Sequence, residues 1–256
     1  SLVDIKECHL QRSPCSKIVN FIREICLQNG WKPWNFKQKK GYLKHLVIKT
    51  AENTIDTMVN LVTESYNSEC LKILSRLIQE QFPDVTTFVN SILPENSQDV
   101  SKANVEVLYG KGIIHERITN YLFEIKPNAF FQPNVLQAES LYKFAVEYAQ
   151  PKGDEVVYDL YCGVGTFSLF FSPHVKKVIG IDVDKEAIDS ACNNAKSNNI
   201  TNCEFYSGDV IRLLTQEFIE QHGKPDMIIV DPPRAGLHKK LIHFIKRLKP
   251  SVFIYI

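Results

Sequence analysis

The chain has 256 residues, with 30 Lys and Arg against 29 Asp and Glu, so its formal net charge is +1. Its 44% of hydrophobic residues excludes a mostly disordered chain, and the length suits one large domain or two small ones. No stretch approaches the roughly 18 uninterrupted apolar residues of a membrane helix, and the first seven residues have no apolar core like that of a secretory signal. We therefore expect a cytoplasmic protein without a membrane segment. Because the chain starts at Ser1 rather than Met, we also expect it to come from a longer protein.

Cysteine usage indicates reduced thiols. The number is odd, the spacing is irregular, and no pair shows the C-x-x-C pattern that is typical of zinc or iron–sulfur sites. We therefore expect no disulfide framework and no metal site. The seven cysteines are Cys8, Cys15, Cys26, Cys70, Cys162, Cys192 and Cys203.

The first half of the chain, residues 1–126, is predicted to be a smaller α+β domain. Apolar residues at helical spacing predict a helix over 15–29, ended by Gly30, and a second over 67–81, closed by Pro83. The remaining apolar stretches are short and β-rich, with hairpin-like spacing and little alternation with helices, so we expect an antiparallel sheet. The predicted strands are residues 42–50, 57–63, 85–92, 105–109, 113–118 and 121–125.

The second half, residues 127–256, is predicted to be an α/β domain. Asn134 can cap a helix, and strands and helices alternate strictly after it. Near-continuous apolar strands of this kind predict a parallel sheet that is covered on both faces. The predicted strands are 156–161, 175–181, 203–206, 227–230 and 252–256, and the helices between them are 166–171, 185–198, 210–220 and 239–248.

A glycine turn follows the first of these strands, where the chain runs through Gly163 and Gly165 into the next helix. Two glycines permit a tight turn and let backbone N–H groups approach a ligand at a helix start, although a plain tight turn is the alternative. The second strand ends at Asp182, nineteen residues after Gly163, where a carboxylate can accept both hydroxyls of a ribose. Ser168 stands where a nicotinamide site prefers a third glycine, which favours S-adenosylmethionine over NAD.

Two further strands end in acidic residues. Asp209 follows the third strand and can accept a hydrogen bond from an adenine amino group, or it can simply cap the next helix. Asp231 follows the fourth strand and precedes Pro232 and Pro233, which fix the chain direction, so we expect a rigid carboxylate beside the reactive end of the cofactor. The alternative for Asp231 is a proline-rich turn whose carboxylate caps nearby N–H groups.

Three segments of the chain stand out together, namely Phe130-Phe131-Gln132-Pro133-Asn134, Asp159-Leu160-Tyr161-Cys162-Gly163-Val164-Gly165-Thr166-Phe167-Ser168-Leu169 and Asp231-Pro232-Pro233-Arg234-Ala235-Gly236-Leu237. In this order they resemble the S-adenosylmethionine-dependent RNA uracil-5 methyltransferases, which form 5-methyluridine in tRNA or rRNA. The resemblance implies a Rossmann-like class I methyltransferase domain. It also implies cofactor contacts from Gln132, Tyr161, Thr166, Asp182 and Asp231, with Gly163 and Gly165 forming the turn and Asp209 a weaker candidate. Many members carry Glu where this chain has Asp182.

The resemblance further implies covalent catalysis by a cysteine in a Ser-Cys-Asn-Pro segment after the fifth strand. None of the seven cysteines matches that position, so we assign no catalytic residue and expect the domain to be truncated at the fifth strand. Residues 1–256 would then hold cofactor without turnover. The expected partner is tRNA or rRNA, and the oligomeric state stays open.

Residues 31–44 interleave five Lys with four aromatic residues and contain no acid. This pattern suits contact with RNA phosphates and stacking on bases. The alternative is a solvated basic loop with Trp31 and Trp34 in the core. For the whole chain, the alternative to an enzyme is an RNA-binding module with a vestigial methyltransferase fold, while Ser168 and the Asp231 segment disfavour an oxidoreductase.

Overall fold

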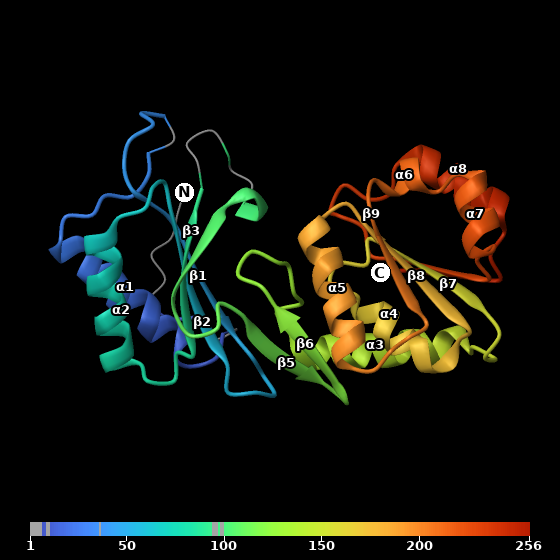
Figure 1. The fold of residues 1–256 in the computed structure, drawn as a ribbon, viewed down its shortest axis with the longest axis horizontal. Coiled ribbons are helices and arrows are strands. Elements are labelled where there is room, and N and C mark those ends of the chain that lie inside the picture. The colour runs from blue at the N-terminus through green and yellow to red at the C-terminus, as the bar shows by residue number, and fades with distance from the viewer. Residues whose placement is uncertain (1–6, 9–10, 36, 94–96, 98–99) are drawn as a thin grey trace. The chain divides into compact units, whose positions relative to one another are not determined.

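The structure, a computed structural model, describes residues 7, 8, 11–35, 37–93, 97 and 100–256. Within these residues the chain forms two compact units (Figure 1). The first unit is the described part of residues 1–116 together with residues 125–128, and the second unit is residues 117–124 together with residues 129–256.

The first unit is built on a four-stranded sheet with the order β1-β2-β3-β4. Both of its helices, α1 and α2, pack on one face of this sheet, where Ile18 and Leu74 meet Val59 and Phe88 in a shared apolar core. A short 3₁₀ helix, η1, precedes β4. The elements are α1 (Cys15–Gln28), β1 (Leu43–Thr50), β2 (Thr57–Thr63), α2 (Ser68–Gln81), β3 (Thr87–Ile92), η1 (Val100–Lys102) and β4 (Asn104–Tyr109).

This sheet is mixed, so the predicted antiparallel sheet is wrong in one place. Strands β1 and β2 are antiparallel, as are β3 and β4, but β2 and β3 run parallel. The reason is helix α2, which connects β2 to β3. It returns the chain to the end of the sheet at which β2 began, as a parallel pair requires. The two helices of this unit therefore have different roles, since α2 is a crossover connection whereas α1 precedes the sheet.

A two-stranded hairpin, β5 (Ile114–Ile118) and β6 (Tyr121–Ile125), leads from the first unit into the second. The predicted boundary after residue 126 differs from the observed division, because residues 117–124 belong to the second unit. Asparagine side chains of helix α5 and of its C-terminal end hold this segment. The amide N–H of Leu122 donates to Asn198 Oδ1 and that of Glu124 donates to Asn194 Oδ1, each at 2.8 Å.

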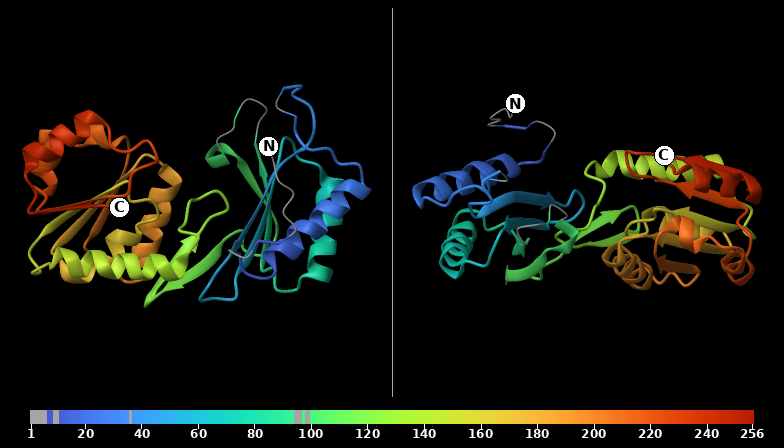
Figure 2. Two further views of the ribbon diagram at one scale, coloured as in Figure 1. Left: turned by 180° about the vertical axis from the view of Figure 1, so that it is seen from behind. Right: turned by 90° about the horizontal axis from the view of Figure 1, so that it is seen from above.

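The second unit has a five-stranded parallel sheet with the order β11-β10-β7-β8-β9. Helices α3, α4 and α5 lie on one face and α6, α7 and α8 on the other, which confirms the predicted α/β class (Figures 1 and 2). The elements are α3 (Val135–Ala149), β7 (Val156–Leu160), α4 (Thr166–Phe171), η2 (Ser172–His174), β8 (Lys177–Asp182), α5 (Lys185–Ser197), β9 (Cys203–Ser207), α6 (Val210–Leu213), α7 (Gln216–His222), β10 (Met227–Val230), α8 (Lys239–Leu248) and β11 (Val252–Tyr255).

Two apolar cores, one on each face, explain why the strands of this sheet are continuous apolar runs. Successive side chains of a strand point to opposite faces, so Val157 enters the core under α3 and α4 while Tyr158 enters the core under α7 and α8. Both side chains are fully buried. A strand buried on both sides loses the alternation of polar and apolar residues, and this is the pattern that the sequence shows.

The predicted helix over 210–220 is wrong as a single element. It is divided into α6 and α7, because Thr215 leaves the helical conformation and caps the second piece by accepting a hydrogen bond from the amide of Phe218 at 3.2 Å. None of the helices among the described residues is both long and apolar enough to cross a bilayer.

Replacing Asn194 by Ala should lower the free energy of unfolding by about 2–4 kcal/mol. Asn194 is 1% exposed, accepts from Glu124 N–H and donates from Nδ2 to the carbonyl of Val164 at 3.0 Å, so the change leaves two polar backbone groups without a partner. The same change at the exposed Asn193 of α5 is the matched control and should shift stability by less than about 0.5 kcal/mol. Urea unfolding of both variants measures the difference, and equal losses would contradict the assigned role of Asn194.

Candidate functional site

The chain turns sharply where β7 ends, in the segment that the sequence singled out. Tyr161, Gly163 and Gly165 adopt the left-handed backbone conformation, with φ of 66°, 54° and 84°. Glycine accepts this conformation freely, whereas a tyrosine does so at a cost of roughly 1 kcal/mol or more. The turn is pinned to the neighbouring strand, because the amides of Tyr161 and Cys162 both donate to the carbonyl of Ile181 at 2.8 and 3.1 Å.

A close approach also fixes the start of α4. A Cβ atom at Gly165 would lie 3.1 Å from the ring of Phe205, and one at Gly180 would lie 2.5 Å from the same ring. Phe205 of β9 therefore occupies the space that side chains at both glycines would need. A side chain at Gly180 would force this ring to shift, and one at Gly165 would crowd it.

Asp182 ends strand β8 and joins two loops. Its Oδ2 accepts the amide N–H of Gly163 and its Oδ1 accepts that of Asp184, both at 2.9 Å. A carboxylate offers about four acceptor positions, so two remain for ribose hydroxyls. The backbone carbonyl of Asp182 also accepts the amide of Gly208 at 2.8 Å, which links β8 to the loop after β9.

Asp209 follows β9 and performs the capping role that the sequence left as the alternative. Its Oδ1 accepts the amides of Ile211 and Arg212 at 3.0 and 3.1 Å, at the start of α6. Both bonds use one oxygen, and within the described residues the other oxygen of this exposed side chain has no donor. Capping and ligand contact are therefore compatible at Asp209.

Asp231 follows β10 and is half-buried, and this burial raises its pKa above the usual value of an aspartate. Among the described residues no donor reaches its carboxylate. Val230 of β10 pairs with Leu160 of β7, so Asp231, the next residue, lies beside Tyr161 where the turn begins.

The two remaining predicted contacts differ in their surroundings. Thr166 is the first residue of α4, and its side chain interacts with the buried hydroxyl of Tyr142. Gln132 is half-buried in the loop before α3, and no hydrogen bond within the described chain joins it to the other predicted residues. Its role stays a prediction.

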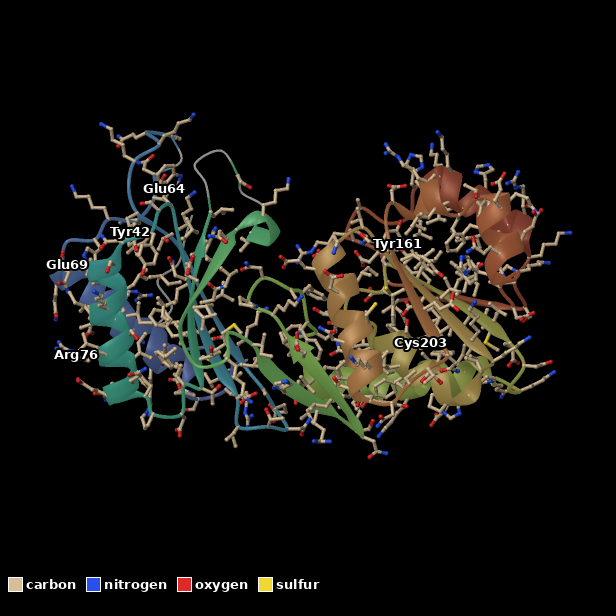
Figure 3. All side chains as sticks on the ribbon, viewed as in Figure 1. Tyr42, Glu64, Glu69, Arg76, Tyr161 and Cys203 are labelled. Atoms are coloured by element: carbon tan, nitrogen blue, oxygen red, sulfur yellow. The ribbon has the colours of Figure 1, made fainter. Side chains whose placement is uncertain are left out.

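Neighbouring strands bring most of these groups to one edge of the sheet. The order β10-β7-β8-β9 places Asp231, the Tyr161 turn, Asp182 and Asp209 side by side at the carboxyl ends. The pKa of Tyr161 is raised first by burial and then by the charges of Asp209 and Asp182, in line with the neighbouring positions of β7, β8 and β9 in the sheet. Figure 3 labels Tyr161 near this edge and Cys203 near the other end of β9. An edge with three carboxylates attracts a cationic ligand.

One buried acid, to which the sequence pattern gave no role, supports the turn from within strand β7. Asp159 lies within β7 at 1% exposure, and its Oδ2 accepts both the amide N–H and the hydroxyl of Ser168, at 3.0 and 2.6 Å. Its Oδ1 is buried with no hydrogen-bond partner in the described residues. An acid inside an otherwise apolar strand was the available signal. The bond also explains Ser168, which supplies a hydroxyl where a nicotinamide site would have glycine.

The thiol of Cys162 is unsuited to nucleophilic attack. It is buried in the turn, and burial raises its pKa well above the usual value, with the charges of Asp159 and Asp182 adding to the effect. Since the thiolate is the reactive form, this side chain stays protonated. Nowhere in the part of the chain that the structure describes do three or more His, Cys, Asp or Glu side chains gather as metal ligands would.

A hollow of about 560 Å³ lies away from this edge, between α5 and the outer strand β9. It is lined by Lys196, Asn199, Glu204 and Tyr206 among others, and by none of the predicted cofactor residues. We place the candidate site at the sheet edge because the polar groups converge there.

The chain matches known proteins over its whole length. The model of the tRNA (uracil-5-)-methyltransferase family matches residues 99–256. An uncharacterized RNA methyltransferase of Bacteroides thetaiotaomicron is 38% identical over 98% of this chain and 56% of its own, and one of Clostridium tetani is 36% identical over 100% and 55%. The chain therefore spans about half the length of the curated relatives it matches.

Solved structures agree with this match. The tRNA (uracil-54, C5)-methyltransferase of Pyrococcus abyssi, in complex with S-adenosyl-L-homocysteine, is 31% identical with a TM-score of 0.79, over 100% of this chain and 60% of its own. Trm5b of Pyrococcus abyssi, 19% identical with a TM-score of 0.51 over 78% of this chain and 56% of its own, shares the fold alone.

Asp159 should make stability depend on pH. Burial raises its pKa from 3.8 to about 7, so the folded state binds a proton that the unfolded state releases above pH 4. The contribution of Asp159 to the free energy of unfolding is fully present below pH 4 and is lost as the pH rises through 7. From pH 5 to pH 8, the free energy of unfolding of the wild type should fall by about 2–3 kcal/mol relative to Asp159→Asn.

Urea unfolding at pH 5 and pH 8 measures this difference. Asp189→Asn, at an exposed site that pairs with Lys185, is the control and should follow the wild type. Parallel pH profiles for the wild type and Asp159→Asn would show that Asp159 does not titrate in this range.

Proposed function

Because the chain belongs to the tRNA (uracil-5-)-methyltransferase family, we propose that the protein transfers a methyl group from S-adenosylmethionine to C5 of a uridine in RNA. The observation that carries the proposal is the row of groups at the carboxyl edge of the sheet, namely the Tyr161 turn, Asp182, Asp209 and Asp231. The matching tRNA methyltransferase of Pyrococcus abyssi, with its bound S-adenosyl-L-homocysteine, supports a tRNA rather than an rRNA substrate.

The residues at this edge fit the proposed cofactor. Asp182 has two acceptor positions left for the ribose hydroxyls, and Asp209 has one oxygen left for an adenine amino group. Asp231 is half-buried and has no protein donor among the described residues, so its carboxylate suits the ammonium group at the methionine end of the cofactor. Gln132, Thr166 and the backbone at Gly163 and Gly165 complete the proposed set. The sulfonium cation supplies an electrophilic methyl group, and nearby carboxylates favour its positive charge.

Uracil C5 is too weakly nucleophilic to take a methyl group unaided. In the proposed mechanism a cysteine thiolate adds to C6, and the electron pair of the C5–C6 double bond moves onto the C4 oxygen as an enolate. C5 then bonds to the methyl carbon as the bond from that carbon to sulfur breaks. A base removes the C5 proton, and the thiolate leaves C6. The target base must first leave its stack.

No cysteine of this chain suits the role of nucleophile. Burial raises the pKa of the thiols of Cys15, Cys26, Cys70, Cys162, Cys192 and Cys203, to about 11 for Cys26 and to about 12 for Cys70 and Cys203. Cys8 lies before α1 and, like the other six cysteines, does not match the position after the fifth strand at which the resemblance places the nucleophile. We therefore propose that residues 1–256 by themselves bind the cofactor without methylating RNA.

Asp182→Asn should weaken the binding of S-adenosyl-L-homocysteine about ten- to a hundredfold, because a charge-assisted hydrogen bond is worth about 1.5–3 kcal/mol. Isothermal titration calorimetry on the 256-residue chain measures the change. Asp189→Asn, which removes the same charge at an exposed site on α5, should bind as the wild type does. Unchanged affinity in Asp182→Asn would remove Asp182 from the proposed site.

The activity itself is tested with the full-length protein. Cells that lack its gene should lose a 5-methyluridine from their tRNA, as measured by mass spectrometry of digested RNA, and the intact gene should restore it. Unchanged 5-methyluridine would contradict the proposal. If the protein bound tRNA but not S-adenosyl-L-homocysteine, the RNA-binding module would be the better description.

A further inference from the structure

Residues 32–35 and 37–43 of the first unit form the two sides of a short hairpin ahead of β1. The amide of Trp34 donates to the carbonyl of Leu43 and that of Asn35 donates to the carbonyl of Lys40, each at 2.7 Å. The amide of Leu43 returns a hydrogen bond to the carbonyl of Lys32 at 3.1 Å. The segment is therefore an ordered projection of the unit, which is seen in blue at the upper left of Figure 1.

Two local features fix the backbone of this hairpin. The side-chain oxygen of Asn35 accepts the amides of Lys37 and Gln38, both at 3.0 Å, close to the tip. Gly41 has φ of 125°, and a Cβ atom there would collide with the carbonyl oxygen of Pro33 at 2.2 Å. Only glycine fits at position 41, so the two sides of the hairpin are held close together.

Aromatic residues anchor the base of the hairpin. Trp31 and Tyr42 pack against the core of the first unit, and Figure 3 shows Tyr42 and Glu64 near each other there. The ammonium group of Lys44 lies 4.8 Å from the centre of the Trp34 ring and donates to the carbonyl of Leu93 at 2.5 Å. Trp31 is thus partly buried at the margin of the core rather than within it, and the lysines nearer the tip are exposed.

The exposed part of the hairpin is strongly basic. Lys32, Lys37, Lys39 and Lys40 are all exposed, and no acid occurs between residues 31 and 44. An acidic residue, Glu64, lies only at the base of the hairpin, where its amide donates to the carbonyl of Tyr42. Since the whole chain has a net charge of +1, this concentration of charge is local.

We propose that the hairpin formed by residues 32–35 and 37–43 is a docking element for the phosphate backbone of the RNA substrate. Lysine ammonium groups at an exposed tip can each replace a counterion on a phosphate, and they read no sequence. The ordered backbone lowers the entropy cost of presenting several charges at once. The inference rests on the proposed function for the identity of the polyanion, and it adds the surface that holds the polyanion.

The test compares two triple variants of the 256-residue chain. The first is Lys32→Gln with Lys37→Gln and Lys40→Gln. The second, the matched control, makes the same change at Lys17, Lys72 and Lys224, which are outside the hairpin. Binding to a fluorescent tRNA transcript is measured by anisotropy over a range of KCl concentrations.

The hairpin variant should bind at least about tenfold more weakly at low salt, and the slope of log affinity against log salt should shrink by about 2–3, because each lysine that no longer neutralises a phosphate reduces the slope by about one. The control should keep the wild-type slope to within about one. Equal weakening in both variants, or an unchanged slope in the hairpin variant, would overturn the proposal.

Gly41→Ala separates geometry from charge. It leaves every lysine in place but forces Pro33 and the opposite side of the hairpin apart, so it should also weaken tRNA binding severalfold. Wild-type affinity in this variant would show that an ordered hairpin is not required and would overturn the docking element as proposed.

Calorimetry with S-adenosyl-L-homocysteine keeps this test distinct from that of the proposed function. All variants should bind this ligand as the wild type does, since none of the changed residues belongs to the proposed set of cofactor contacts. If the wild type binds the ligand and tRNA but the hairpin variant binds tRNA equally well, only the hairpin proposal fails. If the wild type does not bind the ligand, the proposed function fails. If the wild type binds no tRNA, the hairpin proposal fails.

Discussion

The left-handed turn between β7 and α4 is the constraint on which the rest of the second unit depends. In a parallel sheet the chain must turn from the end of a strand into the next helix within a few residues. Here three residues with positive φ make this change of direction. The buried pair of Asp159 and Ser168 ties the strand to the helix on one side of the turn, and the carbonyl of Ile181 holds it on the other. Strand β7, which leads into this turn, lies between β8, which ends at Asp182, and β10, which Asp231 follows.

Two of the three acidic groups at the sheet edge, Asp182 and Asp209, have structural partners within the protein itself. Asp182 accepts two backbone amides and Asp209 caps α6, so each carboxylate is held in one orientation by the protein itself. Groups held in this way lose little freedom on binding, which is the usual advantage of a preorganised site. Asn194 extends the support by bonding to the turn at Val164 and to β6 at Glu124. The site therefore depends on side chains from segments that are distant in sequence.

Much of the second unit could be predicted from the sequence because its signals are local. Long apolar strands, caps such as Asn134 and acids at strand ends each show in a few consecutive residues. The misses have non-local causes. The parallel pairing of β2 with β3 depends on the end of the sheet to which α2 returns the chain. The hydrogen-bond partner of Asp159 is Ser168, nine residues further on in the next helix. The left-handed conformation of Tyr161 has no sequence signature, since tyrosine gives no hint of positive φ.

The ring of Phe205 has an implication for how this domain can evolve. It lies against two glycines, one on β8 and one in the turn, that are respectively twenty-five and forty residues before it in the chain. A methyl group gained at Gly180 would collide with this ring and would also lie 3.0 Å from the sulfur of Cys162. A larger residue at position 180 therefore requires Phe205 to shift, so the two positions cannot vary independently.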